Sequence, residues 1–333
     1  MPQLRKDPVS NRWVIVNIEN PRPADSFPHE HLKRSTKACP FCPGNEAMTP
    51  PELLVLGRKH GSKDTSNWLV RVVSNKFPAL RIEEKNEGSR SGVYERHGGF
   101  GAHEVIIENP DHMREIPDLP VEHIELILEA YRERCIDLRN DTRFKHIIIF
   151  KNFGASAGAS LEHPHSQLIA LPIVPSRILS ELKGSSRHHD YTETCLFCAM
   201  VQTERKEKRF TVVDESDFIA MTPFASRFPF EMWILPKTHS ASFDSLSADA
   251  AKSLARTLKA ALGKLKTALV NPSYNWMIHT LPIGAGETGS YHWHFQIIPH
   301  LTRVAGFELG TGFYVNPTPP ELAAETLRNC NPS

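Results

Sequence analysis

The chain has 333 residues, of which 40% are hydrophobic and 23% charged, and its formal net charge is +1. This length allows two domains, and the balanced charge excludes a broad electrostatic surface for nucleic acid or an anionic membrane. No run of about 18 apolar residues is present, so we expect no membrane-spanning helix. Because the first 20 residues also lack the apolar centre of a signal peptide, we expect a cytoplasmic protein.

The first half of the chain combines strand patterns with one long helix pattern. β-Branched and apolar runs predict strands at 12–16, 68–73, 104–108 and 146–150. Apolar residues recur at helical spacing from 120 to 138, which predicts an amphipathic helix. The stretch 82–99 is polar and contains glycine, so we expect a mobile loop there. These elements lead to a histidine-rich motif.

The motif is His163-Pro-His165-Ser-Gln167, followed by the apolar run 168–171. On a strand, side chains two residues apart share a face, so the two imidazoles and the amide should lie together. The preceding turn, 152–160, is rich in Gly, Ala and Ser, which lets backbone N–H groups approach an anion. A strand edge with two solvated histidines is the plainer interpretation.

A second copy of the motif, His292-Trp-His-Phe-Gln, argues against the plainer interpretation. The second half repeats the order of the first, with predicted strands at 210–213, 218–221, 231–235 and 275–279 and a predicted helix at 248–269. This agreement indicates an internal duplication. We therefore predict an α+β fold with two antiparallel-sheet halves, each with a packed helix. The polar stretch 176–193 marks the boundary, which gives domains 1–175 and 176–333.

Four of the six cysteines form two C-x-x-C pairs, one in each half. In a cytoplasmic chain this arrangement favours metal binding over structural disulfides, and a buried or redox pair is the alternative. Histidines follow each pair at matching places, so we predict two structural, tetrahedral zinc sites. The predicted ligands are Cys39, Cys42, His112 and His163 in the first half and Cys195, Cys198, His239 and His292 in the second.

The closing segment, 303–320, is rich in Gly, Pro and aromatic residues and belongs to neither repeat. Such an addition to a repeated fold is a candidate substrate loop. Within it, Phe307 and Tyr314 offer apolar faces, and Glu308 offers hydrogen-bond acceptors. Its glycines permit bending. We therefore expect the loop from Gly306 to Asn316 to close over a substrate.

The knuckle Cys39-Pro-Phe-Cys42, the turn 152–160 and His163-Pro-His165-Ser-Gln167 resemble the galactose-1-phosphate uridylyltransferase family, a branch of the histidine-triad superfamily. The resemblance covers nearly the whole chain and implies a duplicated histidine-triad fold. It also implies that His165 is a covalent nucleophile and that Gln167 donates to phosphoryl oxygens. The other implied contacts are Asn152, Gly158 and Ser160 for phosphate and nucleotide, and Asn75 and Phe77 for the nucleoside.

Two positions depart from the pattern of this family. Ser166 stands where the common motif has Gly, and Tyr314 aligns where the best-known members have Gln. The closing segment is similar to a branch that includes prokaryotic uridylyltransferases and a plant-type ADP-glucose phosphorylase, which leaves the base and the acceptor open. Some members also have a metal site of one Glu and three His. The matching residues are Glu181, His279, His292 and His294, a set that we rank second to the cysteine-containing one.

The resemblance implies transfer of UMP between UDP-glucose and galactose 1-phosphate, in two displacements at His165. The alternative is an ADP-glucose phosphorylase, which uses the same residue and passes the nucleotide to inorganic phosphate. Gln167 cannot act as a general acid or base, which favours transfer over hydrolysis. A nucleotide-binding, zinc-stabilised scaffold without turnover is a different class. We expect a nucleotide sugar and a sugar phosphate as partners, a homodimer, and neither nucleic acid nor membrane.

Overall fold

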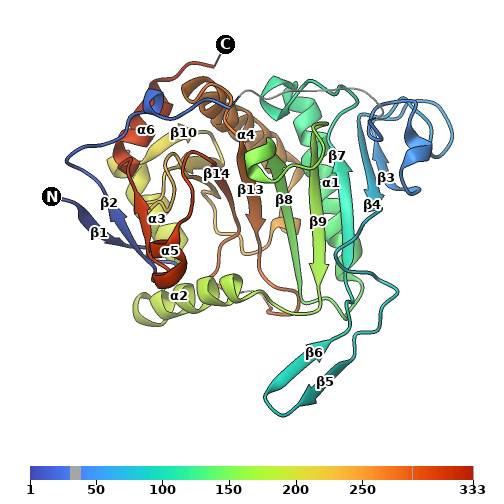
Figure 1. Cartoon of the computed structure of the whole chain (residues 1–333), viewed down its shortest axis with the longest axis horizontal. Helices are drawn as coiled ribbons and strands as arrows, with labels where there is room; N and C mark the ends of the chain where they lie inside the picture. The colour runs from blue at the N-terminus through green and yellow to red at the C-terminus, as the bar shows by residue number, and fades with distance from the viewer. Residues whose placement is uncertain (31–38, 287, 333) are drawn as a thin grey trace.

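A ten-stranded antiparallel sheet forms the centre of the computed structural model, which describes residues 1–30, 39–286 and 288–332 (Figure 1). From one edge to the other, the strands are β10 (Thr211–Asp214), β11 (Phe218–Met221), β12 (Met232–Pro236), β14 (His294–Pro299), β13 (Tyr274–His279), β8 (His146–Phe153), β9 (His165–Leu171), β7 (Ala102–Ile107), β4 (Val70–Ser74) and β3 (Glu52–Leu56). Neighbouring strands pair antiparallel throughout.

The two halves of the chain contribute equally to this sheet and in the same order. Counted from the middle, the first half supplies β8, β9, β7, β4 and β3, and the second supplies β13, β14, β12, β11 and β10. The halves meet where β13 pairs with β8, with Asn275 opposite Asn152. The predicted α+β fold is confirmed, with the difference that both halves share one sheet. The domain boundary between residues 175 and 176 stays a prediction.

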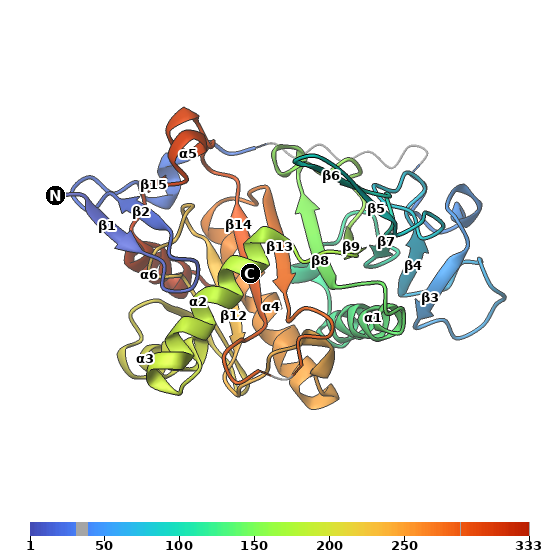
Figure 2. The same ribbon diagram turned by 90° about the horizontal axis from the view of Figure 1, so that it is seen from below.

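Helices α1 (Val121–Arg139) and α4 (Ala248–Ala268) cover one face of the sheet and pack against each other (Figure 2). Their apolar faces, which the helical spacing in the sequence indicated, bury Leu128 and Leu258 in one hydrophobic core. This core also contains Trp276 of β13 and continues across the junction of the halves. The motif strands β9 and β14 therefore lie on a rigid support, because packed cores resist local deformation.

The remaining elements surround this sheet. The other helices are α2 (Ser176–Thr192), α3 (Leu196–Glu207), α5 (Gly306–Thr311) and α6 (Pro320–Asn329), and the short 3-10 helices are η1 (Ala24–Ser26), η2 (Glu46–Met48), η3 (Ile116–Asp118), η4 (Ala155–Ala157) and η5 (Phe243–Ser245). A small sheet contains β1 (Gln3–Lys6), β2 (Trp13–Val16) and β15 (Tyr314–Asn316), with β15 parallel to β2. Among the described residues, no helix has the length and apolar character needed to cross a membrane.

Three segments differ from the sequence-based expectation. The stretch 82–99, predicted to be a loop, contains a hairpin of β5 (Gly88–Ser91) and β6 (Tyr94–His97), which projects from the body (Figure 1). Its residues are exposed and mostly polar, so no buried face produces an alternating pattern. The polar stretch 176–193 forms helix α2, which buries only four residues. The closing segment contains α5 and β15 instead of being a plain loop.

Candidate active site and metal clusters

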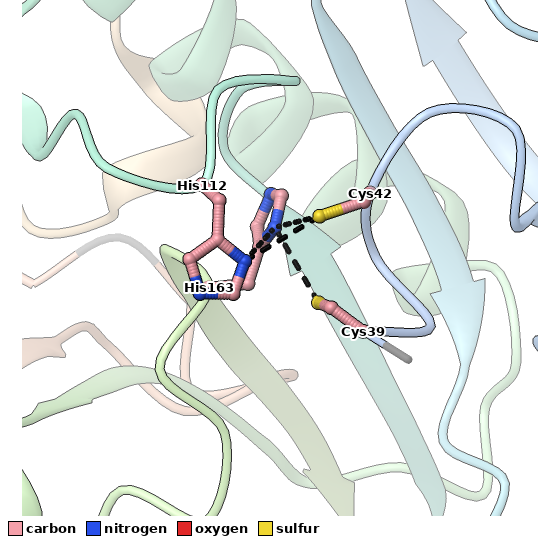
Figure 3. A group of neighbouring side chains, drawn as sticks. All are labelled: Cys39, Cys42, His112 and His163. Carbon is pink, nitrogen blue, oxygen red and sulfur yellow. Dashed lines mark hydrogen bonds between the residues drawn. The ribbon is translucent and has the colours of Figure 1, made fainter. Parts of the chain in front are cut away.

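The first predicted metal set converges immediately before strand β9 (Figure 3). Cys39 and Cys42 come from the knuckle loop, His112 from the segment after β7, and His163 from the start of the motif. The Nδ1 atoms of the two histidines are 3.3 Å apart. The Sγ atom of Cys42 lies 3.4 Å from Nδ1 of His112 and 3.6 Å from Nδ1 of His163, and the Sγ atom of Cys39 lies 3.6 Å from Nδ1 of His163.

These separations fit the edges of a coordination tetrahedron. Ordinary zinc bond lengths place two ring nitrogens about 3.4 Å apart and a nitrogen and a sulfur about 3.6 Å apart. Nε2 of His163 donates to the Asn109 carbonyl at 2.9 Å, which leaves Nδ1 as the ligand atom. Burial, together with the Cys39 thiol, raises the pKa of the Cys42 thiol to about 11. A cation between the thiols would stabilise the thiolate pair, so the four residues could hold a metal ion.

The second predicted set, Cys195, Cys198, His239 and His292, converges in the same way. The Sγ atom of Cys198 lies 3.5 Å from Nδ1 of His239 and 3.7 Å from Nδ1 of His292. The Sγ atom of Cys195 lies 3.9 Å from the same His292 nitrogen. Nε2 of His292 donates to the Pro236 carbonyl at 2.9 Å, which again leaves Nδ1 as the ligand atom. Both repeats therefore present a ligand set of the same kind.

The alternative set from the sequence does not come together as four residues. Glu181, His279 and His294 form a third cluster, whereas His292 lies with the cysteines. Glu181 Oε2 is 2.8 Å from Nδ1 of His279. Burial acts to raise the pKa of Glu181, but the neighbouring His279, His294 and Arg177 together lower it to about 2. The cysteine set and the glutamate cluster thus occupy separate places and share no residue.

His165, the predicted nucleophile, opens strand β9 and is buried, with 6% of the residue exposed. Its Nδ1 lies 2.8 Å from the His163 carbonyl oxygen, so Nδ1–H donates there and Nε2 carries the lone pair. Burial lowers the pKa of His165 to about 4, which keeps the ring neutral at pH 7. The Phe41 ring packs against it with the ring centroids 5.3 Å apart. A neutral imidazole in a fixed tautomer can act as a nucleophile.

Two cavities meet at His165, which lines both of them together with Ser160 and Leu161. The first has a volume of about 330 Å³, and the second has a volume of about 600 Å³. Polar residues of the first include Glu115, Lys151 and Asn152, and the second is lined by Phe41, Asn75, Phe77, His103 and Gln167, among others. Both volumes suit small-molecule ligands. The imidazole of His165 therefore has room on two sides, one rich in turn residues and the other containing the predicted nucleoside contacts.

The three predicted phosphate contacts in the turn before the motif differ in their position relative to the first cavity. Asn152 and Ser160 line the first cavity. Gly158 is not among the described residues that line either cavity. Its φ of +84° closes the turn, and its N–H donates to the Ala155 carbonyl at 3.0 Å. A side chain is strained in this left-handed conformation, so Gly158 shapes the turn while the other two residues face the cavity.

The second cavity contains a hydrogen-bonded group that includes one residue not found from the sequence. Asn75 accepts the Phe77 N–H at 2.9 Å, and the Phe77 side chain is 84% exposed. The additional residue is His103 on β7, whose Nε2 lies 2.8 Å from Oε1 of Gln167 and 3.1 Å from Nδ2 of Asn75. Its Nδ1 accepts the Ala79 N–H at 3.1 Å. The available signal was a polar residue beside an apolar strand pattern.

A buried ion-pair network under the first cavity was also missed. Lys151 is 1% exposed and pairs with Glu108 and, at 2.9 Å, with Glu115. Burial acts to lower the pKa of Lys151, but the two carboxylates raise it above its ordinary value. Ser166 donates to the Tyr131 hydroxyl at 2.7 Å, and that hydroxyl donates to Glu108 at 3.1 Å. A lysine inside the apolar pattern of β8 was the sequence signal.

The predicted substrate residues of the closing segment lie away from these cavities. Phe307 and Glu308 are on α5, where Glu308 caps the helix by accepting the Ala305 N–H at 3.1 Å. Tyr314 is on β15 and packs edge-on against Phe228. Helix α5 lies beside β1, β2 and β15, across the sheet from β4 and β7 (Figures 1 and 2). The structure therefore does not bring these three residues to His165 of the same chain.

The second motif has the same backbone geometry but a closed environment. Nδ1 of His294 lies 3.1 Å from the His292 carbonyl oxygen, as His165 does relative to His163. The aromatic rings of Phe197 and Trp233 pack on His294, which is fully buried. Burial lowers the pKa of His294 to about 3. The imidazole of His294 is therefore enclosed by side chains, whereas that of His165 faces two cavities.

Comparisons with known proteins agree with this architecture. Residues 2–175 match the N-terminal domain of galactose-1-phosphate uridyl transferase, and residues 180–329 match its C-terminal domain. The ADP-glucose phosphorylase of Arabidopsis thaliana is 40% identical, covering 98% of this chain and 92% of its own. The galactose-1-phosphate uridylyltransferase of Thermotoga maritima is 28% identical, covering 98% of both chains.

Solved structures give the same result. A crystal structure of the Arabidopsis thaliana ADP-glucose phosphorylase with bound ADP-glucose superposes with a TM-score of 0.84 at 38% identity, covering 99% of this chain and 100% of that chain. A structure described as a uridylyltransferase superposes with a TM-score of 0.78 at 28% identity, covering 99% and 98%. The resemblance seen in the sequence is confirmed. The chain belongs to the galactose-1-phosphate uridyl transferase family of nucleotidyl-transferring proteins.

Proposed function

We propose that the protein transfers a nucleotidyl group from a nucleotide sugar through a covalent intermediate on His165. The observation that carries this proposal is the placement of one imidazole between two cavities. Nδ1–H of His165 is held by the His163 carbonyl, so the lone pair is on Nε2. The pKa of about 4 keeps that nitrogen unprotonated at neutral pH, which nucleophilic attack requires.

The reaction consists of two displacements. In the first, the Nε2 lone pair of His165 forms a bond to the α-phosphorus, and the bond from that phosphorus to the bridging oxygen breaks, which releases the sugar 1-phosphate. In the second, a phosphate oxygen of the acceptor attacks the same phosphorus, and the P–N bond returns its electrons to Nε2. The proton stays on Nδ1 throughout, and its hydrogen bond to the His163 carbonyl oxygen stabilises the positive charge on the substituted ring.

The residues around the first cavity supply polar groups for the phosphate chain. Asn152 and Ser160 line this cavity on the side of the turn, and Lys151 lies on it as a buried cation. Gln167 lies two residues beyond His165 on the same face of β9, so its amide can reach a phosphoryl oxygen. Donors fixed in place before the reaction stabilise developing charge without reorganisation.

ADP-glucose with inorganic phosphate as acceptor is the better supported of the two substrate pairs expected from the sequence. The Arabidopsis thaliana phosphorylase is more similar to this chain than the Thermotoga maritima uridylyltransferase. Ser166 and Tyr314 depart from the common uridylyltransferase pattern, which leaves the base and the acceptor open. Transfer of UMP between UDP-glucose and galactose 1-phosphate, which the motif by itself implied, is the second candidate.

We also propose that both cysteine-containing sets bind zinc in a structural role. The support is the match between the nitrogen and sulfur separations and a coordination tetrahedron with four protein ligands. A four-ligand set leaves no open position for a substrate. The first set would tie the knuckle to His163, and thus fix the strand that carries the nucleophile.

A homodimer, which we expect from the sequence, would bring the closing segment to the substrate site of a second copy. Phe307, Glu308 and Tyr314 do not line the cavities beside His165 of their own chain. They could contact the substrate only from a second copy. We therefore propose that α5 and β15 of one protomer complete the sugar-phosphate side of the site of its partner.

The substrate proposal is tested by comparing the two nucleotide sugars directly. The protein is mixed briefly with ADP-glucose or with UDP-glucose, and intact mass shows which nucleotide stays attached. The labelled adduct is then offered inorganic phosphate or galactose 1-phosphate. We expect an adenylyl adduct that phosphate discharges as ADP. A uridylyl adduct that only galactose 1-phosphate discharges would replace this assignment with the second candidate.

A further inference from the structure

The two motif glutamines are both held through their side-chain oxygen. In the second repeat, Oε1 of Gln296 accepts hydrogen bonds from Arg177 at 2.6 Å and from Arg227 at 3.3 Å. Because the oxygen is committed to guanidinium donors, the NH2 group must face the other way. It lies 3.0 Å from Nε2 of His294, the counterpart of the nucleophilic atom. This repeat shows where a motif glutamine directs its NH2 when a donor holds its oxygen.

In the first repeat the donor is His103, and its tautomer is set by the backbone. The Ala79 N–H donates to Nδ1 of His103 at 3.1 Å, so Nδ1 carries the lone pair and Nε2 carries the hydrogen. Nδ2 of Asn75 also lies 3.1 Å from Nε2, and in this tautomer it makes no hydrogen bond to that atom. That hydrogen lies between Nε2 and Oε1 of Gln167, which are 2.8 Å apart. An N–H donor requires an oxygen acceptor, so the amide of Gln167 has only one orientation that fits. Its NH2 group is then directed away from His103.

The sheet register explains why His103 can reach this oxygen. Val105 of β7 lies opposite Gln167, and His103 is two residues away on the same face, diagonal to the glutamine. By register, the corresponding position of the second repeat is Glu231, since Trp233 lies opposite Gln296. Glu231 accepts from Arg227 at 3.1 Å. Each repeat thus uses the same diagonal position, directly or through one arginine, to hold the glutamine oxygen.

We propose that His103 is a positioning residue that orients the amide of Gln167 with its NH2 toward the phosphoryl group on His165. The inference rests on the proposed function for the identity of that group. His103 also connects the nucleotidyl-transfer site to the nucleoside side, because the Ala79 N–H that sets its tautomer belongs to the loop after Asn75 and Phe77. Among the described residues, Nε2 of Gln167 makes no hydrogen bond to protein, which leaves it available to a ligand in the cavity.

The first test requires no substrate. Histidine labelled with 15N gives nitrogen shifts that distinguish the two neutral tautomers, and the His103 signals are identified by their loss in His103→Gln. We expect His103 at about pH 8 to carry its proton on Nε2. A proton on Nδ1 would overturn the proposal, whatever the reaction proves to be, because Nε2 would then require a donor from Gln167.

The second test compares two variants of equal size, His103→Gln and His103→Glu. The amide of the first places a donor near the former Nε2 and can hold the Gln167 oxygen. The carboxylate of the second accepts only, so it turns the Gln167 amide over and places its oxygen toward the phosphoryl group. We expect adduct formation at saturating nucleotide sugar to be on the order of 100-fold slower in His103→Glu than in His103→Gln, with half-saturation changing less.

The control repeats both substitutions in a Gln167→Ala background. If His103 acts through the glutamine, the two variants should then differ by no more than about twofold, since the effects are no longer coupled. An undiminished rate difference between the two variants in the Gln167→Ala background would show that the charge at position 103 acts on the substrate directly. Equal rates of the two variants in the protein that retains Gln167 would show that His103 has no role in orientation. Either result overturns the proposal. Absence of any adduct in the wild type would refute the proposed function instead, while the tautomer measurement would still decide the orientation.

Discussion

At the scale of single residues, the contrast between His165 and His294 shows how one motif gives two outcomes. Both rings donate Nδ1–H to the carbonyl two residues earlier, and burial lowers the pKa of both. Nε2 of His294 lies against the amide of Gln296 and under the rings of Phe197 and Trp233. The two repeats therefore differ in the access to Nε2 of this histidine, and they have the same tautomer.

The low pKa of His165 predicts an unusual pH dependence. Burial lowers it to about 4 from the ordinary 6.5, so the reactive neutral form should persist in mildly acidic solution. Single-turnover adduct formation should stay constant from about pH 8 to about pH 5 and fall below that, since only the unprotonated ring is a nucleophile. Rapid-quench measurements under saturating nucleotide sugar would test this. A decline centred near pH 6.5 in a folded sample would contradict the assigned environment.

The Lys151 network should contribute strongly to stability. Lys151→Met leaves Glu108 and Glu115 buried without their cation, so unfolding free energy should fall by about 3–5 kcal/mol in urea titrations. The control is Lys85→Met, because Lys85 pairs with Glu87 on the surface and is 77% exposed. Its effect should be much smaller. A loss of less than about 1 kcal/mol for Lys151→Met would show that the two carboxylates are accommodated without it.

At the scale of elements, the first cysteine knuckle lies in a loop with little regular structure, whereas the second begins helix α3. Cys39→Ser should therefore lower both metal content and stability, since a structural ion contributes directly to folding. Elemental analysis should give about two ions per chain for the wild type and about one for the variant. Cys135→Ser is the control, because Cys135 is buried in α1 and lies in none of the clusters. Full metal content in a folded Cys39→Ser protein would refute the first site.

The turn 152–160, which we propose contacts phosphate, offers a second test at this scale. Gly158 has a φ of +84°, so Gly158→Ala should cost about 1–2 kcal/mol of stability and slow adduct formation by displacing Ser160. Gly310→Ala is the control, because Gly310 lies inside α5 in open space and has no positive φ. Only Gly158→Ala should lower the thermal unfolding temperature and the single-turnover rate. Equal behaviour of the two would mean that the turn tolerates a side chain.

The order of the elements could be predicted from the sequence because the repeats carry clear periodicities. Helix α1, for example, differs from its expected bounds by one residue at each end, and strand β13 begins one residue earlier than expected. The hairpin β5–β6 and helix α2 could not be predicted, since they bury too few apolar residues to produce a pattern. The two clusters of cysteine and histidine followed from spacing, whereas His103 required the register between β7 and β9, which no local pattern contains.

At the scale of the whole molecule, the continuous sheet makes the second half a support for the first. Asn275 of β13 donates to Oδ1 of Asn152 at 2.8 Å and to the Ala157 carbonyl at 2.9 Å, so the second half holds the turn 152–160. The single hydrophobic core across both halves reinforces this junction. The closed second motif therefore retains a structural role in the site of the first.

The proposed exchange of α5 and β15 between protomers can be tested by complementation. His165→Gly lacks the nucleophile, and a variant with Glu308→Ala and Tyr314→Ala lacks the proposed contacts to the sugar phosphate. Unfolding and refolding the two as a mixture should restore about a quarter of wild-type turnover, because half of the dimers are then mixed and each has one complete site. A mixture no more active than its separately refolded components would contradict a shared site.

The central claim is that His165 alone becomes nucleotidylated, and peptide mapping after brief exposure to ADP-glucose and UDP-glucose tests it most directly. The wild type should carry one nucleotide on the peptide containing His165, and His294→Gly should carry the same adduct. His165→Gly should carry none while remaining folded and able to bind the nucleotide, since the turn and the second cavity are intact. A nucleotide attached to any other residue, or full turnover by folded His165→Gly, would contradict the mechanism.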